Sequence, residues 1–436
     1  MESRFNIANR ASFFTQYADI IAGWIVALLS MGAILFPRAI PFFFLSLALM
    51  AVVELWRTGR TSDVFKTPDI FWILASFFTA WCFITILWSS APQQALEKVF
   101  FLASTLLAAW VVYCWHSNLS PLMSAYLKLG LLAGTAIAGA IIAIEAFSGL
   151  VITKTLLNLF EFLRPDGAKH VKTINNEVQS LGNYLLNRNV ATLNLLLWPA
   201  ILISSDLQIG KWSSIFSAAL IAIVALATFN SAHESSMIAL LVGGAIFAIY
   251  YYVPRAGHIA SILIWIAAVV LIIPAALMAK NASLHEAEWI PLSAQARIVL
   301  WANTAKKYPD NPLLGVGVYT TQSVDDRRNE DVKGPRKHHY HNISTARHSH
   351  NIFMQTWYEL GALGAMLLLA TGLALLSRIN RLPDSVKPLV AAAFTGATII
   401  ASLTWGLWQV WFIAMFAYGG AAMLIATHQD SKPIFR

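Results

Sequence analysis

The chain has 436 residues, of which 58% are hydrophobic and only 12% are charged. Soluble domains carry about 25% charged residues, so this composition excludes a soluble globular protein and indicates an integral membrane protein. The formal net charge of +8 reflects loop orientation signals and binding of anionic lipids or phosphate groups in such a protein. We therefore do not expect nucleic-acid binding.

Apolar segments of about 20 residues, the length that crosses a bilayer, recur along the chain. They predict an all-α polytopic membrane protein with about twelve transmembrane helices. The last two predicted spans are joined tightly around Trp405 and Gly406. The predicted spans are 17–36, 39–56, 70–88, 96–115, 127–149, 186–204, 212–230, 235–253, 259–279, 351–376, 387–406 and 408–427.

Lysines and arginines of the short loops predict the orientation, because they favour the cytoplasmic side. With an even number of spans both termini share one side, and that side carries most of these residues. Short loops of the other side contain only Arg38 and Lys98. We expect both termini in the cytoplasm. The chain then has three parts: residues 1–279 with spans 1–9 and an outer loop at 150–188, residues 280–350 as a large outer loop with short helices, and residues 351–436 with spans 10–12 and a cytoplasmic tail.

The first outer loop begins with an apolar pattern at 151–163, which predicts an amphipathic helix lying on the membrane surface. A turn is expected at Arg164-Pro-Asp-Gly167. Arg188 follows at the mouth of the sixth span. It either contacts lipid headgroups at the interface or binds an anionic ligand.

The second outer loop shows helical spacing from Pro291 to Lys307, with Arg297 and Trp301 one turn apart on one side. Tyr308-Pro-Asp-Asn-Pro312 is expected to end this helix. Leu313-Leu-Gly-Val-Gly317 then predicts a compact apolar turn, because its glycines permit positive φ.

A histidine-rich stretch precedes the tenth span, and three interpretations remain open for it. His-x-His spacing can bind a metal, but the many nearby lysines and arginines would repel a cation, so we expect no metal. The stretch is otherwise a solvated basic loop or a basic pocket for an anionic substrate, with one histidine as general base. Asn351 is expected to cap the tenth span and to place His350 at its positive end. The histidines are His338, His339, His341, His348 and His350.

The sequence Asn311-Pro-Leu-Leu-Gly-Val-Gly317, followed by His350-Asn351, Gln355, Glu359-Leu-Gly361 and Gly364, resembles the superfamily of O-antigen ligases, O-antigen polymerases and bacterial protein O-oligosaccharyltransferases. The similarity extends to the number of spans and to the large late loop. It implies a GT-C-like fold and glycosyl transfer on the periplasmic face of the bacterial inner membrane.

For a ligase, the resemblance implies a glycan donor on undecaprenyl diphosphate, a lipid A–core sugar hydroxyl as acceptor, and surrounding membrane lipids as partners. The reaction would invert the anomeric centre and need no metal or other cofactor. Arg188 and Arg297 match the diphosphate-binding arginines. His338 is the first choice for the essential histidine, with His339 and His341 as alternatives, and His348 and His350 match the histidine motif before the tenth span.

Other functions remain as alternatives. A polymerase would use a second lipid-linked glycan as acceptor, and a protein oligosaccharyltransferase would use Ser or Thr. A transporter of lipid-linked anions should show ionisable residues within its spans and broken spans in matching positions. Only Glu145 clearly meets the first expectation, and we expect no such pair of broken spans. A histidine-rich outer sensor is a further possibility. One dominant late loop favours the ligase.

Overall fold

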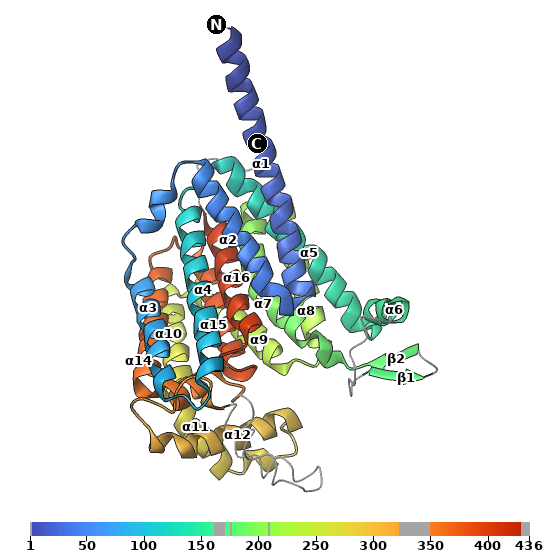
Figure 1. Cartoon of the computed structure of the whole chain (residues 1–436). Helices are drawn as coiled ribbons and strands as arrows, with labels where there is room; N and C mark the ends of the chain where they lie inside the picture. Colours follow the sequence, from blue (N-terminus) through green and yellow to red (C-terminus); the bar gives the residue numbers. More distant parts are fainter. Residues whose placement is uncertain (1, 161–170, 175–176, 208–209, 322–348, 429–436) are drawn as a thin grey trace. The chain divides into compact units, whose positions relative to one another are not determined.

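The computed structural model describes residues 2–160, 171–174, 177–207, 210–321 and 349–428 (Figure 1). The regular secondary structure of the described residues is helical except for a two-stranded antiparallel sheet of β1 (Val171–Ile174) and β2 (Glu177–Leu181). It divides into two compact units, each assembled from separate stretches of sequence. Unit 1 comprises Met1–Val64, Val111–Gly244 and Ala414–Arg436, and unit 2 comprises Phe65–Trp110 and Ala245–Ile413.

Every span predicted from hydropathy coincides with a helix, so the prediction of an all-α polytopic membrane protein is confirmed. Nine described helices are long and apolar enough to cross a membrane, or ten if one bent pair counts as a span. A total of about twelve spans stays a prediction. The helices are α1 (Glu2–Leu35), α2 (Ile40–Arg57), α3 (Ile70–Thr85), α4 (Pro92–His116), α5 (Pro121–Ser148), α7 (Asn187–Asp206), α8 (Lys211–Phe229), α9 (Glu234–Tyr252), α10 (Pro254–Val270), α14 (Ile352–Ile379), α15 (Lys387–Leu403) and α16 (Val410–Thr427).

Two of the predicted spans differ from the others. α7 is less apolar than the other spans, and α15 is shorter. α15 is apolar but has only 17 residues. α7 is buried along almost its whole length and contacts α1, α5 and α8. It therefore accommodates Asn189 and Asn194, both buried, because protein and not lipid surrounds it. The side-chain amides of both asparagines donate hydrogen bonds to protein acceptors, as buried polar groups in a membrane helix require.

In unit 1, α1 and α5 approach so closely that only glycine fits at the contact. A methyl group on Gly130 would lie 2.0 Å from the carbonyl oxygen of Gly23, and one on Gly134 would lie 2.2 Å from that of Ala27. Small residues permit such packing between membrane helices. Ser30 and Tyr418 share a buried hydrogen bond of 2.9 Å between α1 and α16.

The outer element predicted at 151–163 is the helix α6 (Val151–Leu159), which lies beside the β1–β2 hairpin at the end of α5 (Figure 1). It ends earlier than predicted, and the expected turn at 164–167 lies outside the described residues. Val151, Leu156 and Leu159 are exposed on α6, which agrees with the amphipathic pattern.

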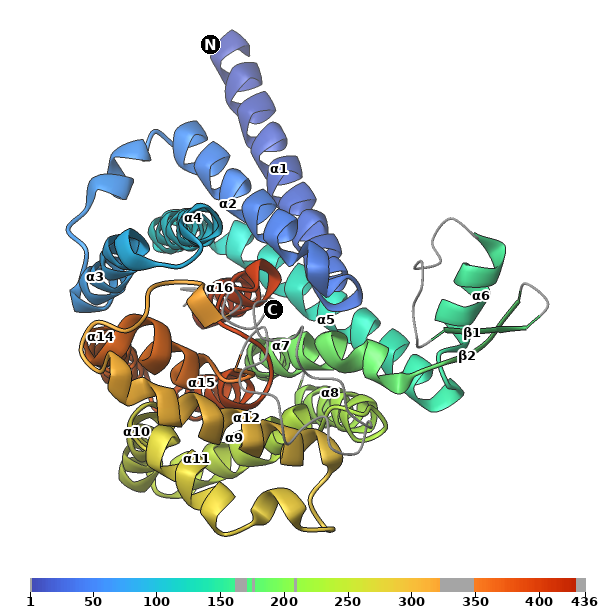
Figure 2. The same cartoon turned by 60° about the horizontal axis from the view of Figure 1, so that its bottom comes forward.

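In unit 2, α14 packs against α3, α10 and α15. The span predicted at 259–279 is not straight, because α10 bends by 70° into α11 (Ile272–Asn281). Pro274 lies in the first turn of α11, where its missing N–H and fixed φ are tolerated. The following helix, α12 (Leu292–Lys307), packs along α11 (Figure 2). It coincides with the helix predicted for the second outer loop.

Short 3-10 turns complete the described structure. They are Pro37–Ala39, Thr61–Phe65, Ile86–Trp88, Asn183–Leu186, Leu284–Glu286 and Tyr308–Asp310.

Candidate functional site

The central feature of unit 2 is a break in α14 at Gly361, which has φ of +66° and ψ of −168°. The segment 311–317 pairs with the backbone on both sides of the break. Val316 and Gly317 donate their N–H groups to the carbonyls of Tyr358 and Glu359, at 3.1 and 2.9 Å. Buried backbone groups that a helix break leaves without a partner in the helix require other hydrogen-bond partners. The segment 311–317 thus supplies the donors for the two carbonyls that precede the break.

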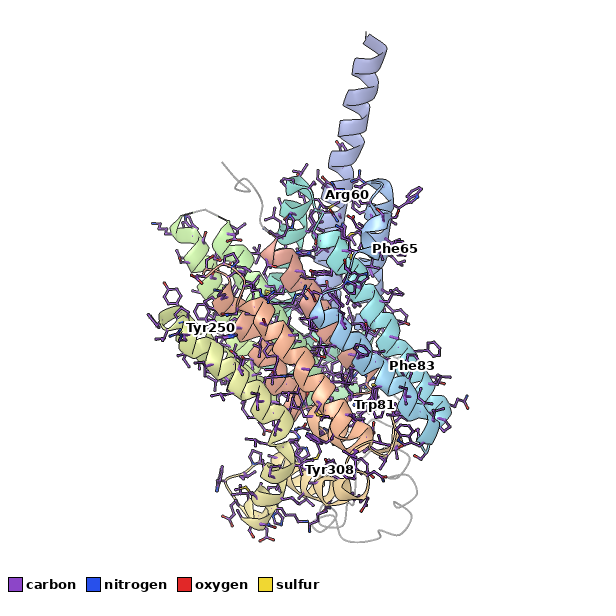
Figure 3. All side chains as sticks on the ribbon, turned by 90° about the vertical axis from the view of Figure 1, so that its left-hand side faces the viewer. Arg60, Phe65, Trp81, Phe83, Tyr250 and Tyr308 are labelled. Carbon is purple, nitrogen blue, oxygen red and sulfur yellow. The ribbon has the colours of Figure 1, made fainter. Side chains whose placement is uncertain are left out.

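On the other side of the break, the N–H groups of Ala362 and Leu363 donate to the carbonyls of Pro312 and Leu313, at 2.9 and 3.3 Å. Trp81 of α3 (Figure 3) donates its indole N–H to the carbonyl of Leu360 at 2.9 Å. The predicted turn after Pro312 is therefore a partner of α14 as well as a turn.

Glycine is required where the two segments meet. Gly315 has φ of +71° and Gly317 has φ of +94°, as the sequence predicted. A methyl group on Gly315 would lie 2.4 Å from the backbone of Glu359, and one on Gly361 would lie 2.3 Å from the carbonyl oxygen of Leu313. Both contacts are far inside van der Waals distance. The spacing of these glycines therefore specifies a close approach of two backbones.

Glu359 is fully buried beside the break and accepts hydrogen bonds from four donors. Tyr319 and Thr321 donate backbone N–H groups at 2.9 and 3.1 Å. Gln355 donates its side-chain amide at 3.1 Å, and the indole of Trp408 donates to the other oxygen. A buried carboxyl group needs such partners. Glu359 thereby joins α14 to segments on either side of it in sequence.

Gln355, one turn before Glu359, extends this network. Its side-chain oxygen accepts the backbone N–H of Leu407 at 2.8 Å. Gln355 and Glu359 together hold the segment between α15 and α16 against the first half of α14. The family resemblance includes both residues only as parts of a motif. Their i, i+4 spacing was the available signal, since it places two polar side chains on one helix face.

His350 lies immediately before α14 with φ of +53°, a region that few residues other than glycine occupy. Its Nδ1 lies 2.5 Å from the carbonyl oxygen of Thr404. A carbonyl can only accept, so Nδ1 carries the proton and donates. In the neutral ring, this tautomer leaves the basic lone pair on Nε2.

Asn351 fixes the chain beside His350 and caps α14, as predicted. Its side-chain oxygen accepts the N–H of Met354 at 2.9 Å, and its amide donates to the carbonyl of Ser402 at 2.7 Å. Ser349 is also held, because Trp301 of α12 donates its indole N–H to the carbonyl of Ser349 at 2.7 Å. The segment 349–351 therefore has a fixed geometry.

Arg297 is half-buried on α12, one turn before Trp301. Residues four apart lie on one face of a helix. Arg297 thus lies on the face of α12 from which Trp301 contacts the segment 349–351. α12 is anchored by a small apolar core of Ala276, Ala305 and Met354.

Tyr308 lies where α12 ends (Figure 3) and packs edge-on against Trp357, with ring centroids 5.3 Å apart. Burial raises the pKa of Tyr308 above its ordinary value. The phenol is therefore neutral at physiological pH, and we assign it packing and not proton transfer.

Arg188 belongs to unit 1, where it is half-buried in the first turn of α7. Among the predicted site residues, Arg297 and His350 are described together in unit 2. His338, His348 and the alternatives His339 and His341 lie outside the described residues, so their predicted roles are not tested. The same holds for metal binding by this stretch.

The apolar helices, with a buried polar network at a broken helix, define a multi-pass membrane protein. Residues 218–369 match the model of the family described as O-Antigen ligase. This range includes α12, the segment 349–351 and the break in α14. The resemblance to the O-antigen ligase family that the motifs predicted is therefore confirmed over this range.

Similar proteins cover most of the chain. A protein named "Putative polysaccharide ligase" from Rickettsia felis is 26% identical over 348 residues, which are 77% of this chain and 76% of that protein. A protein of the same name from Rickettsia bellii is 24% identical over 422 residues, which are 90% of this chain and 93% of that protein. The similarity thus extends well beyond the matched domain.

Proposed function

We propose that this protein is an O-antigen ligase of the bacterial inner membrane. It transfers a glycan from undecaprenyl diphosphate to a sugar hydroxyl of lipid A–core on the periplasmic face, with both termini in the cytoplasm. The family match at residues 218–369 carries this proposal. The names of the similar Rickettsia proteins support the transfer of a polysaccharide.

The reaction exchanges one bond at the anomeric carbon. The acceptor hydroxyl oxygen attacks that carbon from the face opposite the diphosphate, which inverts the configuration. The bond between the anomeric carbon and the diphosphate oxygen breaks, and undecaprenyl diphosphate leaves with the electron pair. A general base takes the proton of the hydroxyl. The protein must therefore stabilise a leaving anion and accept one proton.

Arg188 and Arg297 are the proposed ligands of the diphosphate. Guanidinium groups bind phosphate oxygens with two parallel hydrogen bonds and stay charged at every relevant pH. Stabilisation of the developing charge by such groups needs no metal ion. Both arginines are half-buried, which strengthens their electrostatic effect relative to that of a fully solvated side chain.

A histidine is the proposed base, with His338 as first choice and His348 and His350 as alternatives. A histidine suits this role because its ordinary pKa lies near ambient pH. General-base catalysis contributes about 10²–10⁴-fold. For His350, the bond from Nδ1 to Thr404 supports the tautomer that a base requires, with its lone pair on Nε2.

A purified assay tests the proposal directly. Detergent-solubilised protein is mixed with undecaprenyl-diphosphate glycan and lipid A–core, in the presence of a chelator and without added metal. We expect a glycolipid product that grows with time. Absence of product, or a strict need for added divalent cation, would overturn the proposed mechanism. Product formed from a second lipid-linked glycan alone would identify a polymerase.

Variants assign the residues. We expect His338→Ala to lower the transfer rate by about 10²–10⁴-fold, and Arg297→Ala by about 10–100-fold through lost charged hydrogen bonds. His116→Ala is a matched control, because His116 contacts Tyr113 at the end of α4 and has no proposed role. Unchanged activity in His338→Ala with loss in His350→Ala would move the base to His350.

A further inference from the structure

A second basic residue lies beside Arg188 in unit 1. α1 ends at Leu35, and the 3-10 turn Pro37–Ala39 that follows carries Arg38. This turn contacts α7, whose first turn carries Arg188. Two parts of the chain that are far apart in sequence, each with an arginine, are thus in contact.

Asn189 fixes this arrangement. Its side-chain amide donates to the carbonyls of Ile34 and Leu35, at 2.8 and 3.0 Å. Carbonyls in the last turn of a helix lack donors within the helix, so Asn189 supplies what the end of α1 needs. Asn189 is buried. Since Asn189 directly follows Arg188, and Ile34 and Leu35 shortly precede Arg38, these bonds hold the two backbone segments together.

The turn that carries Arg38 and the helical turn that carries Arg188 are thus held in contact, and both side chains are positively charged. Arg38 is exposed, whereas Arg188 is half-buried. Within the described residues, no carboxylate lies within ion-pair distance of Arg38. Like charges held near each other by packing repel, and an anion bound to both would offset that repulsion.

Other arginines of the chain have a partner within the protein that accepts their hydrogen bonds. Arg57 pairs with Glu54 at 2.8 Å, and Arg378 pairs with Asp69 at 2.8 Å. Arg60 donates to the amide oxygen of Asn118 at 2.6 Å. Arg38 differs from all three, because its charged neighbour has the same sign. This contrast indicates a ligand and not a structural ion pair.

We propose that Arg38 and Arg188 together bind the diphosphate group of the polyprenyl donor, with Arg38 as a ligand additional to the two arginines named above. The inference rests on the proposed function for the identity of the donor. A diphosphate suits the pair because it offers two charged phosphate groups to two guanidinium forks. A phospholipid headgroup is the other source of the same phosphate chemistry, and the experiment separates the two.

Binding without turnover tests this inference. The purified full-length protein is titrated with farnesyl diphosphate in detergent, and the dissociation constant is measured by calorimetry for Arg38→Gln, Arg188→Gln and the double variant. We expect each single variant to bind about 10–100-fold more weakly. The double variant should lose less than the product of the two factors, because both residues contact one ligand. Arg60→Gln is the matched control and should bind like the wild type.

Further arms separate other outcomes. Arg38→Lys keeps the charge and should bind with intermediate affinity, and equal thermal stability of all variants excludes misfolding. Wild-type affinity in Arg38→Gln would overturn the inference. The inference would also be overturned if phosphatidylglycerol in nanodiscs competes for the site as strongly as farnesyl diphosphate binds to it. Wild-type protein that binds the diphosphate but forms no glycolipid product would instead refute the proposed function and leave this inference standing.

Discussion

Two buried carboxyl groups, Glu145 in unit 1 and Glu359 in unit 2, lie in apolar helices. They differ in the parts of the chain to which they are hydrogen-bonded. Glu145 is 3% exposed and Glu359 is 0% exposed. Ionisable residues within membrane helices mark functional sites by default. Here hydrogen bonds explain why both carboxyl groups are buried. The two residues differ in how far along the sequence their hydrogen-bond donors lie.

Glu145 acts over a short distance along the chain. It accepts the N–H of Ile152 at 2.6 Å and that of Thr153 at 3.2 and 3.3 Å, together with the hydroxyl of Thr153. These donors belong to the first turn of α6, which begins at Val151. Glu145 is thus a cap for the next helix, and this explains an ionisable residue that would otherwise favour transport.

Glu359 acts over a long distance along the chain. Besides Gln355 of the same helix, its donors are Tyr319 and Thr321 before α14 and Trp408 after α15. A carboxyl group with donors in several segments stabilises tertiary structure, whereas one with donors in the adjacent helix stabilises that helix. We therefore expect global effects from changes at Glu359 and local effects from changes at Glu145.

Replacing Glu359 with Ala should have the largest effect on stability. The change leaves at least the N–H groups of Tyr319, Thr321 and Trp408 buried without an acceptor, at about 1–3 kcal/mol each. We expect the free energy of unfolding to fall by several kcal/mol. Thermal unfolding of the purified protein in detergent measures this fall. Glu359→Gln keeps one acceptor oxygen and should lose about half as much.

Glu97→Ala serves as the control for Glu359, because Glu97 is exposed on α4. Surface substitutions change stability by about 0.5 kcal/mol or less. If Glu359→Ala unfolds at the same temperature as Glu97→Ala, the carboxyl group does not hold the segments together as its contacts indicate.

Replacing Gly361 with Ala should have the next largest effect. A residue with a side chain in a strained backbone region costs about 1–3 kcal/mol, and the added methyl group would also lie 2.3 Å from the carbonyl oxygen of Leu313. We expect a lower unfolding temperature and faster proteolysis within residues 311–321. Limited proteolysis with mass spectrometry locates the cleavage.

Gly420 in α16 provides the comparison for Gly361. A methyl group on Gly420 would meet no atom within 4 Å, and alanine in a helix interior is more stable than glycine by about 0.5–1 kcal/mol. Gly420→Ala should therefore be neutral or stabilising. Equal losses in the two variants would contradict a special role for the break in α14.

The sequence predicted the local features well and the breaks poorly. All twelve predicted segments coincide with helices, because runs of apolar residues mark most membrane helices, and the cap at Asn351 follows from its own neighbours. The bend before α11 had a signal in Pro274 that the span length concealed. The break at Gly361 had no sufficient local signal, since one glycine in an apolar run is compatible with a helix. It depends on pairing with the distant segment 311–317.

The prediction of the candidate site also succeeded for local features and failed for a long-range one. Motifs selected Arg188, Arg297 and the histidines as residue types suited to diphosphate and proton chemistry. They could not select Arg38, because nothing in its own neighbourhood distinguishes it from an orientation signal. The bonds from Asn189 to the end of α1 hold the turn that carries Arg38 beside the first turn of α7. Long-range pairing is the information that periodicity and composition do not contain.

Replacing Glu145 with Ala should have the smallest effect on global stability and a clear local effect. The first turn of α6 loses its acceptor, while the buried contacts of α5 with α1 and α7 do not depend on that carboxyl group. We expect amide hydrogen exchange at residues 151–159 to accelerate by about tenfold, which corresponds to the loss of roughly one hydrogen bond. The unfolding temperature of the whole protein should change little. If Glu145→Ala lowers the unfolding temperature as much as Glu359→Ala does, the two carboxyl groups do not differ in their structural role. Loss of purely local hydrogen bonds opens a short helix and leaves the remaining structure folded.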